Sequence, residues 1–324
     1  MVQLGDYILS DADDWKQVQQ KAYLENRWFV PEFIQLSGNN IARSYLQPQQ
    51  LEQIINRYNL KDENPSPRKV GIVMAGNIPL VGFHDLLCVF LTGHYAMVKL
   101  SSKDHVLMKH LIERLTQWES KVKKYITISA MIKHCDAYIA TGSNNSSRYF
   151  EYYFGRYPSI IRKNRTSVAI LTGKESKEEL EKLSDDVYQY FGLGCRNVTK
   201  IFVPKNYNFV PLLEAFRKYD HLSDHHKYKN NYDYNLAIHI LNNQYYMTNG
   251  SIILVENQSS FSPISQLHYE YYSNENQVKE KLKGDKSIQC IVSKTDVDFG
   301  GAQRPQVCDY ADGLDTIEFL KGLS

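Results

Sequence analysis

Cys195 is the residue whose type and setting point most directly to chemistry. It closes the glycine-rich segment Gly192-Leu193-Gly194-Cys195, and a strand pattern from Val198 to Val203 follows it. A cysteine in such a turn is open to a substrate, and neighbouring backbone amides lower the pKa of a thiol. The thiolate is the nucleophilic form, so Cys195 is suited to attack a carbonyl carbon and to carry an acyl group as a thioester.

The other four cysteines have settings typical of small buried hydrophobes. They are Cys88, Cys135, Cys290 and Cys308. The five cysteines are scattered, without the close pairs of zinc sites or the dense spacing of disulfide frameworks, so we expect thiols throughout. His225-His226 lies in a polar stretch, where neighbouring histidines are usually solvated, and we therefore expect no metal site.

Composition sets the class of protein. The 324 residues, 43% of them hydrophobic, suffice for about two domains with a sizeable core. Lys and Arg number 38 against 36 for Asp and Glu, so a net charge of +2 gives no reason to expect a nucleic-acid partner. The N-terminus lacks a basic segment followed by an apolar one, and polar residues interrupt the most apolar window, Gly71 to Phe90. We expect a cytoplasmic protein without a membrane span.

Strand and helix patterns alternate after the segment Asn64 to Pro67, which ends a polar, helix-patterned opening. Such alternation is typical of a parallel sheet with helices on both faces. A second series begins after Gly173 and predicts a second α/β domain. The polar, tyrosine-rich stretch from His221 to Tyr234 is predicted to be a surface loop. The predicted strands are Lys69–Met74, Ala96–Leu100, Ala137–Thr141, Val168–Leu171 and Val198–Val203, and the predicted helices are Pro79–Leu91, Asp104–Trp118, Ser146–Phe154, Lys177–Tyr190 and Val210–Tyr219.

Gly76 and Asn77 lie in the turn between the first predicted strand and the helix that follows it. That helix begins with Pro79, which needs no amide partner there, and ends before Gly93, a residue that caps helix C-termini well. Open α/β sheets bind their ligands at turns of this kind. The sequence therefore predicts a ligand site beside Asn77.

Four segments, in the same order, resemble the aldehyde dehydrogenase superfamily. They are Gly76–Leu80 with Tyr95–Ser102, Ala137–Ser143, Gly192–Cys195 and Phe299–Gly301. Leu100 replaces a usual proline and Leu193 replaces a usual glutamine, but the matches span most of the chain from Val70 onward. The residues that follow, Ala302–Pro305 and Asp309–Thr316, look more like those of the fatty acyl-CoA reductases of bacterial bioluminescence, the branch that we favour.

The resemblance implies a fold and a catalytic site. The fold is α/β and aldehyde dehydrogenase-like, with a Rossmann-type cofactor domain built on a parallel sheet and a second α/β catalytic domain. We place the cofactor domain, with the helical N-terminal segment, at residues 1–173, and the catalytic domain, with Cys195 and the C-terminal tail, at residues 174–324. Cys195 is then the nucleophile, and the side-chain amide of Asn77 and the backbone amide of Cys195 hold the tetrahedral oxyanion.

The resemblance also implies a cofactor site. A strand-end lysine and a Thr-Gly-Ser turn offer a cation, hydroxyls and backbone amides to the ribose and pyrophosphate. NAD-dependent enzymes commonly hold the ribose with an acid, which repels a 2′-phosphate. Ser102 stands in that position with Lys103 beside it, so we expect NADPH. The cofactor residues are Lys99, Ser101, Ser102, Thr141, Gly142 and Ser143.

The stretch Arg162-Lys163-Asn164-Arg165 stands where hydrolytic aldehyde dehydrogenases carry the glutamate that activates water. A reductase must keep water from its acyl-enzyme, because a general base there would release the acid. The missing glutamate therefore favours reduction of an acyl-CoA. The basic stretch itself is expected to be a solvated turn, and the tail signature between Gln303 and Thr316 is expected to brace the site.

We expect NADPH-dependent reduction of a fatty acyl-CoA to a fatty aldehyde through an acyl-cysteine. Two other functions fit the same residues. One is reduction of an acyl phosphate on the same fold, and the other is a non-catalytic subunit that binds an acyl-loading partner, because 324 residues is short for an aldehyde dehydrogenase. The resemblance implies a fatty acyl-CoA or an acylated protein as donor, an acyl-protein synthetase as partner, and a homo-oligomer.

Overall fold

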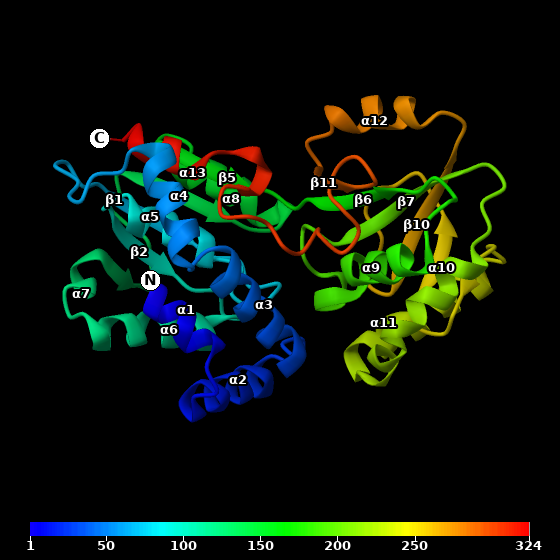
Figure 1. Cartoon of the computed structure of the whole chain (residues 1–324), viewed down its shortest axis with the longest axis horizontal. Coiled ribbons are helices and arrows are strands. Elements are labelled where there is room, and N and C mark those ends of the chain that lie inside the picture. Colours follow the sequence, from blue (N-terminus) through cyan, green and yellow to red (C-terminus); the bar gives the residue numbers. More distant parts are fainter. Residues whose placement is uncertain (324) are drawn as a thin grey trace. The chain divides into compact units, whose positions relative to one another are not determined.

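The computed structural model describes residues 1–323, which fold into two compact units (Figure 1). The first unit holds residues 1–164 and the C-terminal residues from 305 onward, and the second holds residues 165–304. Each unit contains a largely parallel sheet with helices packed on it. The predicted α/β class is confirmed.

The unit boundaries differ from the predicted domains, 1–173 and 174–324, at both ends. β6 (Thr166–Ile170) pairs with strands of the second sheet, so the second unit begins before the predicted boundary. α13 (Thr316–Lys321) packs against α5 (Phe83–Leu91), and its Ile317 and Leu320 are fully buried in the core of the first unit. Burial of these two side chains, rather than their place in the chain, decides where the tail belongs.

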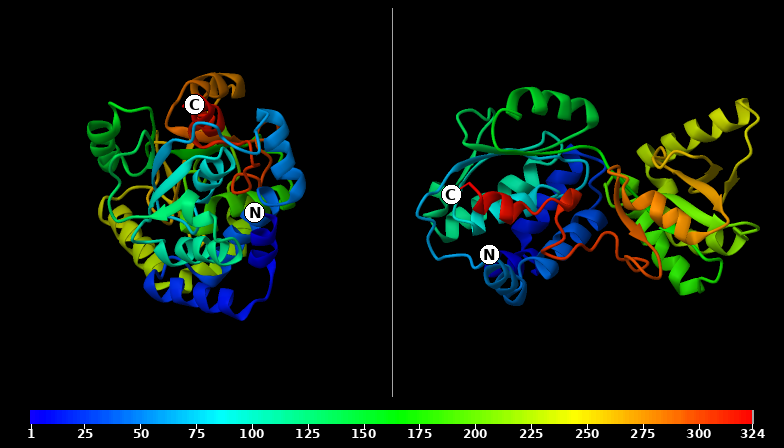
Figure 2. Two further views of the ribbon diagram at one scale, coloured as in Figure 1. Left: turned by 90° about the vertical axis from the view of Figure 1, so that its left-hand side faces the viewer. Right: turned by 90° about the horizontal axis from the view of Figure 1, so that it is seen from above.

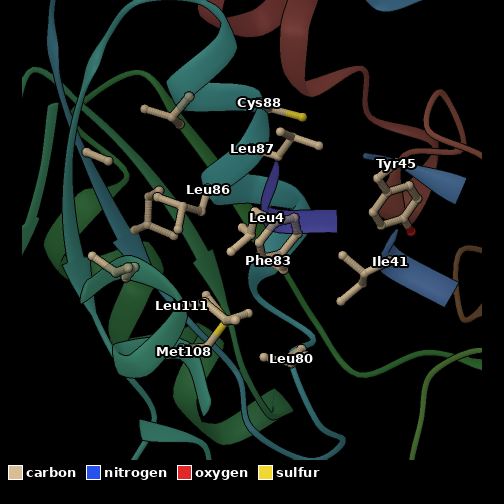
Figure 3. Close-up of a cluster of buried hydrophobic side chains, with 14 of the residues drawn as sticks. Leu4, Ile41, Tyr45, Leu80, Phe83, Leu86, Leu87, Cys88, Met108 and Leu111 are labelled. Atoms are coloured by element: carbon tan, nitrogen blue, oxygen red, sulfur yellow. The ribbon is translucent and has the colours of Figure 1, made fainter. Parts of the chain in front are cut away.

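Four helices open the first unit, within residues 2–58, as the opening pattern predicts. They are α1 (Val2–Leu9), α2 (Asp13–Glu25), α3 (Pro31–Ser44) and α4 (Pro48–Tyr58). The last two begin with proline, whose missing N–H costs no hydrogen bond in a first turn. Leu4 and Ile41 belong, with Leu87 of α5, to the main core of this unit (Figure 3).

Among the described residues, the first unit is built on a five-stranded parallel sheet in the order β3-β2-β1-β4-β5. Its strands are β1 (Lys69–Val73), β2 (Tyr95–Lys99), β3 (Ile126–Ile128), β4 (Ala137–Thr141) and β5 (Ser159–Arg162). The chain moves outward from β1 through β2 and, on the other side, from β4 to β5. Ligands bind at the carboxyl ends of the strands where the strand order reverses in this way.

Helices cover both faces of this sheet, as predicted. α5 and α6 (His105–Trp118) follow β1 and β2, the short α7 (Val122–Tyr125) precedes β3, and α8 (Asn144–Phe154) follows β4. Right-handed crossovers place helices on opposite faces when the chain moves in opposite directions along a sheet. The right-hand view of Figure 2 shows α8, in green, on the other side of the strands from the blue opening helices.

α5 begins at Phe83, and the prediction that it begins at Pro79 is wrong. Pro79 and Leu80 form a turn in which Leu80 has a left-handed backbone with φ of 59°, a conformation that no α-helical residue adopts. Leu80 still points into the core, where it is 1% exposed (Figure 3). The helix ends at Leu91 as predicted, with Gly93 at φ of 69° just beyond it.

The second unit is built, over residues 165–304, on a six-stranded sheet in the order β11-β6-β7-β10-β9-β8. The strands after β6 are β7 (Val198–Pro204), β8 (Met247–Thr248), β9 (Ile253–Glu256), β10 (Gln266–Tyr272) and β11 (Ile288–Val292). The pairing of β8 with β9 is antiparallel and the others are parallel. The helices are α9 (Lys177–Tyr188), α10 (Val210–Ala215), α11 (His226–Leu241) and α12 (Glu275–Lys283). Within residues 1–323, no helix has the length and apolar character of a membrane-spanning segment.

The prediction of a loop from His221 to Tyr234 is wrong, because this stretch belongs to the 3-10 helix η2 (Phe216–Asp224) and to α11. Tyr228 and Tyr232 are buried, at 2% and 6% exposed. The hydroxyl of Tyr228 donates to the C=O of Ser251 at 2.9 Å. Tyrosine buries its ring when its hydroxyl finds a partner, so a polar, tyrosine-rich stretch is compatible with a packed helix.

Arg162 is buried, and the prediction of a solvated turn is wrong at this residue. It ends β5 and is 3% exposed. Its Nη1 donates to Oδ2 of Asp85 in α5 at 2.6 Å, and its Nη2 donates to the hydroxyl of Thr316 in α13 at 2.9 Å. Lys163 and Asn164 are exposed, as a solvated turn requires. One guanidinium therefore joins the sheet, α5 and the tail.

The tail signature braces the first unit through α4. The hydroxyl of Tyr310 donates to that of Tyr58 at 2.9 Å, and the hydroxyl of Tyr58 donates to Asp315 at 2.7 Å. Asp315 also caps α13 by accepting the N–H of Glu318 at 3.0 Å. These contacts give the tail a bracing role within its own unit.

Replacing Arg162 with methionine should destabilise the first unit by about 3–5 kcal/mol, because Asp85 is then left as a buried charge without a cation. Urea unfolding followed by tryptophan fluorescence reports on this unit, since Trp15, Trp28 and Trp118 all lie in it. The exposed Lys163→Met is the matched control and should leave the midpoint nearly unchanged. Equal midpoints for the two variants would contradict the structural role of Arg162.

Candidate active site

Cys195 lies in the second unit, in the turn between the short 3-10 helix η1 (Gln189–Gly192) and β7. Tyr190, Phe191 and Gly192 just before it have left-handed backbones, with φ of 56°, 58° and 73°. The left-handed conformation costs about 1–2 kcal/mol for each non-glycine residue, so surrounding contacts must stabilise this turn. Cys195 itself is half-buried, and its C=O accepts a hydrogen bond from the hydroxyl of Ser167 at 3.2 Å.

Asn197 fixes this turn through a side chain that is 0% exposed. Its Oδ1 accepts the N–H of Gly194 at 2.8 Å, and its own N–H donates to the C=O of Gly194 at 3.1 Å. Its Nδ2 donates to three C=O groups around the end of α9, those of Asp186, Val187 and Gln189, at 3.0, 3.3 and 2.8 Å. Asn197 was not among the predicted site residues, and its signal in the sequence is an asparagine between the nucleophile and an apolar strand.

Asp186 links the same end of α9 to the turn Phe299-Gly300-Gly301. Its carboxylate accepts the N–H of Gly300 at 2.7 Å and that of Ala302 at 2.9 Å. Burial raises the pKa of Asp186 to about 7, although these two N–H groups favour the charged form. The segments Gly192–Cys195 and Phe299–Gly301, which are far apart in the sequence, are therefore both attached to the end of α9.

Burial raises the pKa of the thiol at each of the other four cysteines. The pKa is about 11 at Cys135 and well above the usual value at Cys88. A thiol with a raised pKa is a poor nucleophile near neutral pH. Cys290 lies near the Cys195 turn, since its Sγ is 3.1 Å from the Ser167 hydroxyl that also contacts the C=O of Cys195.

Asn77 lies in the first unit, in the turn between β1 and α5, and its side chain is exposed. The preceding Gly76 is buried against Ser101, where an added Cβ would lie 2.4 Å from the hydroxyl oxygen. Only glycine permits so close an approach. The turn is therefore held tightly against the residues that follow β2.

The predicted cofactor residues gather at the carboxyl ends of three neighbouring strands, β2, β1 and β4. Lys99 ends β2 and is exposed, and Thr141 ends β4. Ser143 caps α8 by accepting the N–H of Ser146 at 3.3 Å, so the start of this helix faces the same turn. The structure thus brings together, within the first unit, Asn77, Lys99, Ser101, Ser102, Thr141, Gly142 and Ser143. Cys195 belongs to the second unit and is not part of this group.

An aromatic groove of about 550 Å³ also lies in the first unit and includes Lys99 in its wall. Its rings are those of Tyr138, Tyr149, Phe150, Tyr153, Phe154 and Tyr157. The rings of Tyr138 and Phe154 are stacked, with centroids 4.2 Å apart. Lys99, Lys133 and Arg156 also line it, and none of the described lining residues is acidic. Planar rings and cations suit an aromatic base that carries phosphates, so these residues fit the nucleotide part of a nicotinamide cofactor.

Among residues 1–323, no three His, Cys, Asp or Glu side chains gather in an arrangement that could hold a metal ion. His225, one of the two adjacent histidines, caps α11 by accepting the N–H of Tyr228 at 3.4 Å.

Asp186 should make the stability of the second unit pH-dependent. The folded state holds the proton more tightly than an unfolded aspartic acid, so this contribution is full below about pH 4 and is lost as the pH rises to about 7. The loss is at most about 1.4 kcal/mol per pH unit. Urea unfolding followed by circular dichroism at pH 5 and pH 8 should show this loss in the wild type and a smaller one in Asp186→Asn. The same pH dependence in both proteins would contradict the assignment.

Known structures share the fold of this chain. A putative aldehyde dehydrogenase from Burkholderia cenocepacia matches with a TM-score of 0.61 and 11% identity, over 86% of this chain and 69% of that one. Aldehyde dehydrogenase 21 from Physcomitrella patens, in complex with the reaction product succinate, matches with a TM-score of 0.71 and 10% identity, over 99% and 83%. An NAD⁺ complex of an aldehyde dehydrogenase from Bacillus cereus matches with a TM-score of 0.64 and 12% identity, over 90% and 70%. The fold is therefore aldehyde dehydrogenase-like, as predicted.

Sequence comparison gives the family. No curated protein sequence matches the chain significantly. The family model of the acyl-CoA reductases (LuxC) matches residues 39–212, which is more than half of the 324 residues and includes Asn77, Lys99 and Cys195. The chain belongs to the acyl-CoA reductase (LuxC) family.

Proposed function

We propose that this protein reduces a fatty acyl-CoA to a fatty aldehyde with NADPH, through a thioester on Cys195. The observation that carries the proposal is the setting of the thiols. Cys195 is half-buried and closes a glycine-rich turn that the buried Asn197 clamps. Burial raises the pKa of the thiol at the other four cysteines, which makes each of them a poorer nucleophile near neutral pH. Family membership supports the acyl-CoA substrate class.

The proposed reaction has two steps, acylation of Cys195 and reduction of the acyl-cysteine. The thiolate of Cys195 attacks the thioester carbonyl, the new C–S bond forms, and CoA leaves as a thiolate that takes up a proton. A bound NADPH would supply a hydride to the acyl carbon and become NADP⁺. The C–S bond to Cys195 would then break, which releases the aldehyde and returns Cys195 as the thiolate. The amide of Asn77 and the N–H of Cys195 stabilise the oxyanion in both steps.

We assign the cofactor to the carboxyl ends of β1, β2 and β4 in the sheet of the first unit. Lys99, Ser101, Ser102 and the Thr141 to Ser143 turn bind ribose and pyrophosphate, and the aromatic groove takes the base. The absence of an acid among the described groove residues, together with Ser102 and Lys103, favours a 2′-phosphate. The Bacillus cereus relative in fold is itself an NAD⁺ complex, which supports a nicotinamide cofactor as the class.

Reduction is favoured over hydrolysis by the residues from Arg162 to Arg165. This stretch contains no carboxylate to activate water, and the guanidinium of Arg162 is engaged by Asp85 and Thr316. An acyl-enzyme without a nearby general base persists until hydride arrives.

Cys195→Ala should abolish both acylation and aldehyde formation, because the proposed path requires a covalent thioester. Mass spectrometry of the intact protein after exposure to acyl-CoA without NADPH measures the first, and NADPH consumption measures the second. Cys290→Ala is the matched control, since this thiol contacts the same Ser167 hydroxyl as the C=O of Cys195, and this variant should still be acylated. A label that survives in Cys195→Ala would overturn the mechanism. Labelling of the wild type by an acyl phosphate but not by acyl-CoA would reassign the substrate.

NADPH should be preferred over NADH by at least about tenfold in kcat/KM, which corresponds to about 1.4 kcal/mol in transition-state binding. The comparison is made at saturating acyl-CoA with each cofactor titrated in turn. Equal use of the two cofactors, or a preference for NADH, would refute the assignment of the 2′-phosphate.

A further inference from the structure

Leu80 poses a structural problem that the turn beside Asn77 must solve. Its backbone is left-handed, with φ of 59°, and the residue is 1% exposed, so its N–H is shielded from water. Leu80 lies before α5, which begins at Phe83, so no carbonyl of that helix accepts its N–H. A buried N–H without an acceptor destabilises the folded state. The acceptor here is Oδ2 of Asp104, at 2.6 Å.

Asp104 serves this turn instead of its own helix. It is the N-cap residue of α6, a position where aspartate normally accepts an N–H of the first turn, yet its side chain makes no such bond. The residue is 4% exposed, and burial raises the pKa of its carboxyl well above the usual value. Within the described structure its Oδ1 has no hydrogen-bond partner. Burial of a carboxyl group costs free energy unless the group is hydrogen-bonded. The hydrogen bond from the N–H of Leu80 offsets part of that cost at Asp104.

Asn77 lies between two fixed points of the turn. Before it, Gly76 is pressed against Ser101, whose C=O accepts the N–H of Asp104 at 3.1 Å. After it, the N–H of Leu80 is bound to the Asp104 carboxyl. The residues around Asp104 therefore hold both ends of the segment that presents the exposed amide of Asn77.

We infer that Asp104 is a positioning residue, which sets the direction of the Asn77 amide by holding the turn from Gly76 to Leu80. This inference rests on the proposed function, in which Asn77 stabilises the oxyanion. Ser37 adds a second, weaker hold, because its hydroxyl donates to the C=O of Pro79 at 2.7 Å.

The test measures the rate of Cys195 acylation in rapid-mixing experiments with acyl-CoA and no NADPH. Asp104→Leu keeps the size of the side chain and removes the acceptor, and it should slow acylation at least tenfold while leaving NADPH affinity unchanged. Asp104→Asn keeps a carbonyl acceptor for the N–H of Leu80 and should restore the rate to within about threefold of the wild type. Asn77→Ala alone should slow acylation about a hundredfold.

A double-mutant cycle separates positioning from simple destabilisation. If Asp104 acts through Asn77, Asp104→Leu should cause no further loss in the Asn77→Ala background. Thr92→Val is the control for lost stability, because it removes a buried hydroxyl at the other end of α5, which donates to Cys88 C=O at 2.9 Å, and it should not slow acylation.

Three results would overturn the inference: full acylation by Asp104→Leu, losses that multiply in the double mutant, or a tenfold loss in Asp104→Asn. If Asp104→Leu does not fold, Ser37→Ala carries the cycle, and its smaller loss must likewise vanish in the Asn77→Ala background. Failure of the proposed function has a different signature. In that case the wild type is not acylated, or Asn77→Ala has the full rate whatever residue 104 is.

Discussion

The last carbonyl groups of a helix have no hydrogen-bond partners within the helix. In the second unit this constraint determines how the turn that carries Cys195 is held. Many helices meet the need with a glycine that turns the chain back. At the end of α9, Nδ2 of Asn197 instead donates hydrogen bonds to three carbonyl groups. Oδ1 of the same side chain accepts the N–H of Gly194. The turn with Cys195 is thus built on the end of the helix, and Asp186 attaches the Phe299-Gly300-Gly301 turn to the same place.

The first unit solves the opposite problem in a related way. There an orphan N–H at the approach to α5 is met by a buried carboxyl, whereas in the second unit orphan carbonyls are met by a buried amide. In both cases left-handed, non-glycine residues lie beside the contact: Leu80 in one unit and Tyr190 and Phe191 in the other. Backbone strain of this kind persists only where surrounding contacts over-determine it. The residues that we assign to chemistry sit next to these two points of strain.

The sequence predicted those parts of the fold that local periodicity specifies. β4 matches its predicted bounds, β1 and α6 differ from theirs by a single residue at one end, and β2 differs by one residue at each end. The start of α5 was misplaced because proline at a first turn is a local signal, whereas the left-handed Leu80 depends on a distant carboxyl. Arg162 was read as solvated because its partners, Asp85 and Thr316, are far away in the chain.

The candidate site divides in the same way. Glycines, strand ends and the turn that carries a cysteine are local features of the sequence. Cys195 and Lys99 could therefore be predicted as site residues from the sequence alone. The roles of Asn197, Asp186 and Asp104 exist only through contacts, and the groove combines β4, α8 and a loop near residue 133. A pattern of aromatic residues along α8, Tyr149, Phe150, Tyr153 and Phe154, was the one sequence signal for that groove.

The return of the tail to the first unit has a consequence for the order of assembly. The chain leaves the first unit after Asn164 and comes back at Pro305, so the second unit is a continuous insertion. Domains tend to fold as units while the chain is being made, N-terminal parts first. Here most of the first unit is made before the second, yet Ile317, Leu320 and the Thr316 hydroxyl that meets Arg162 are made only after the whole of the second unit. The core of the first unit can therefore be completed only after the second unit has been made.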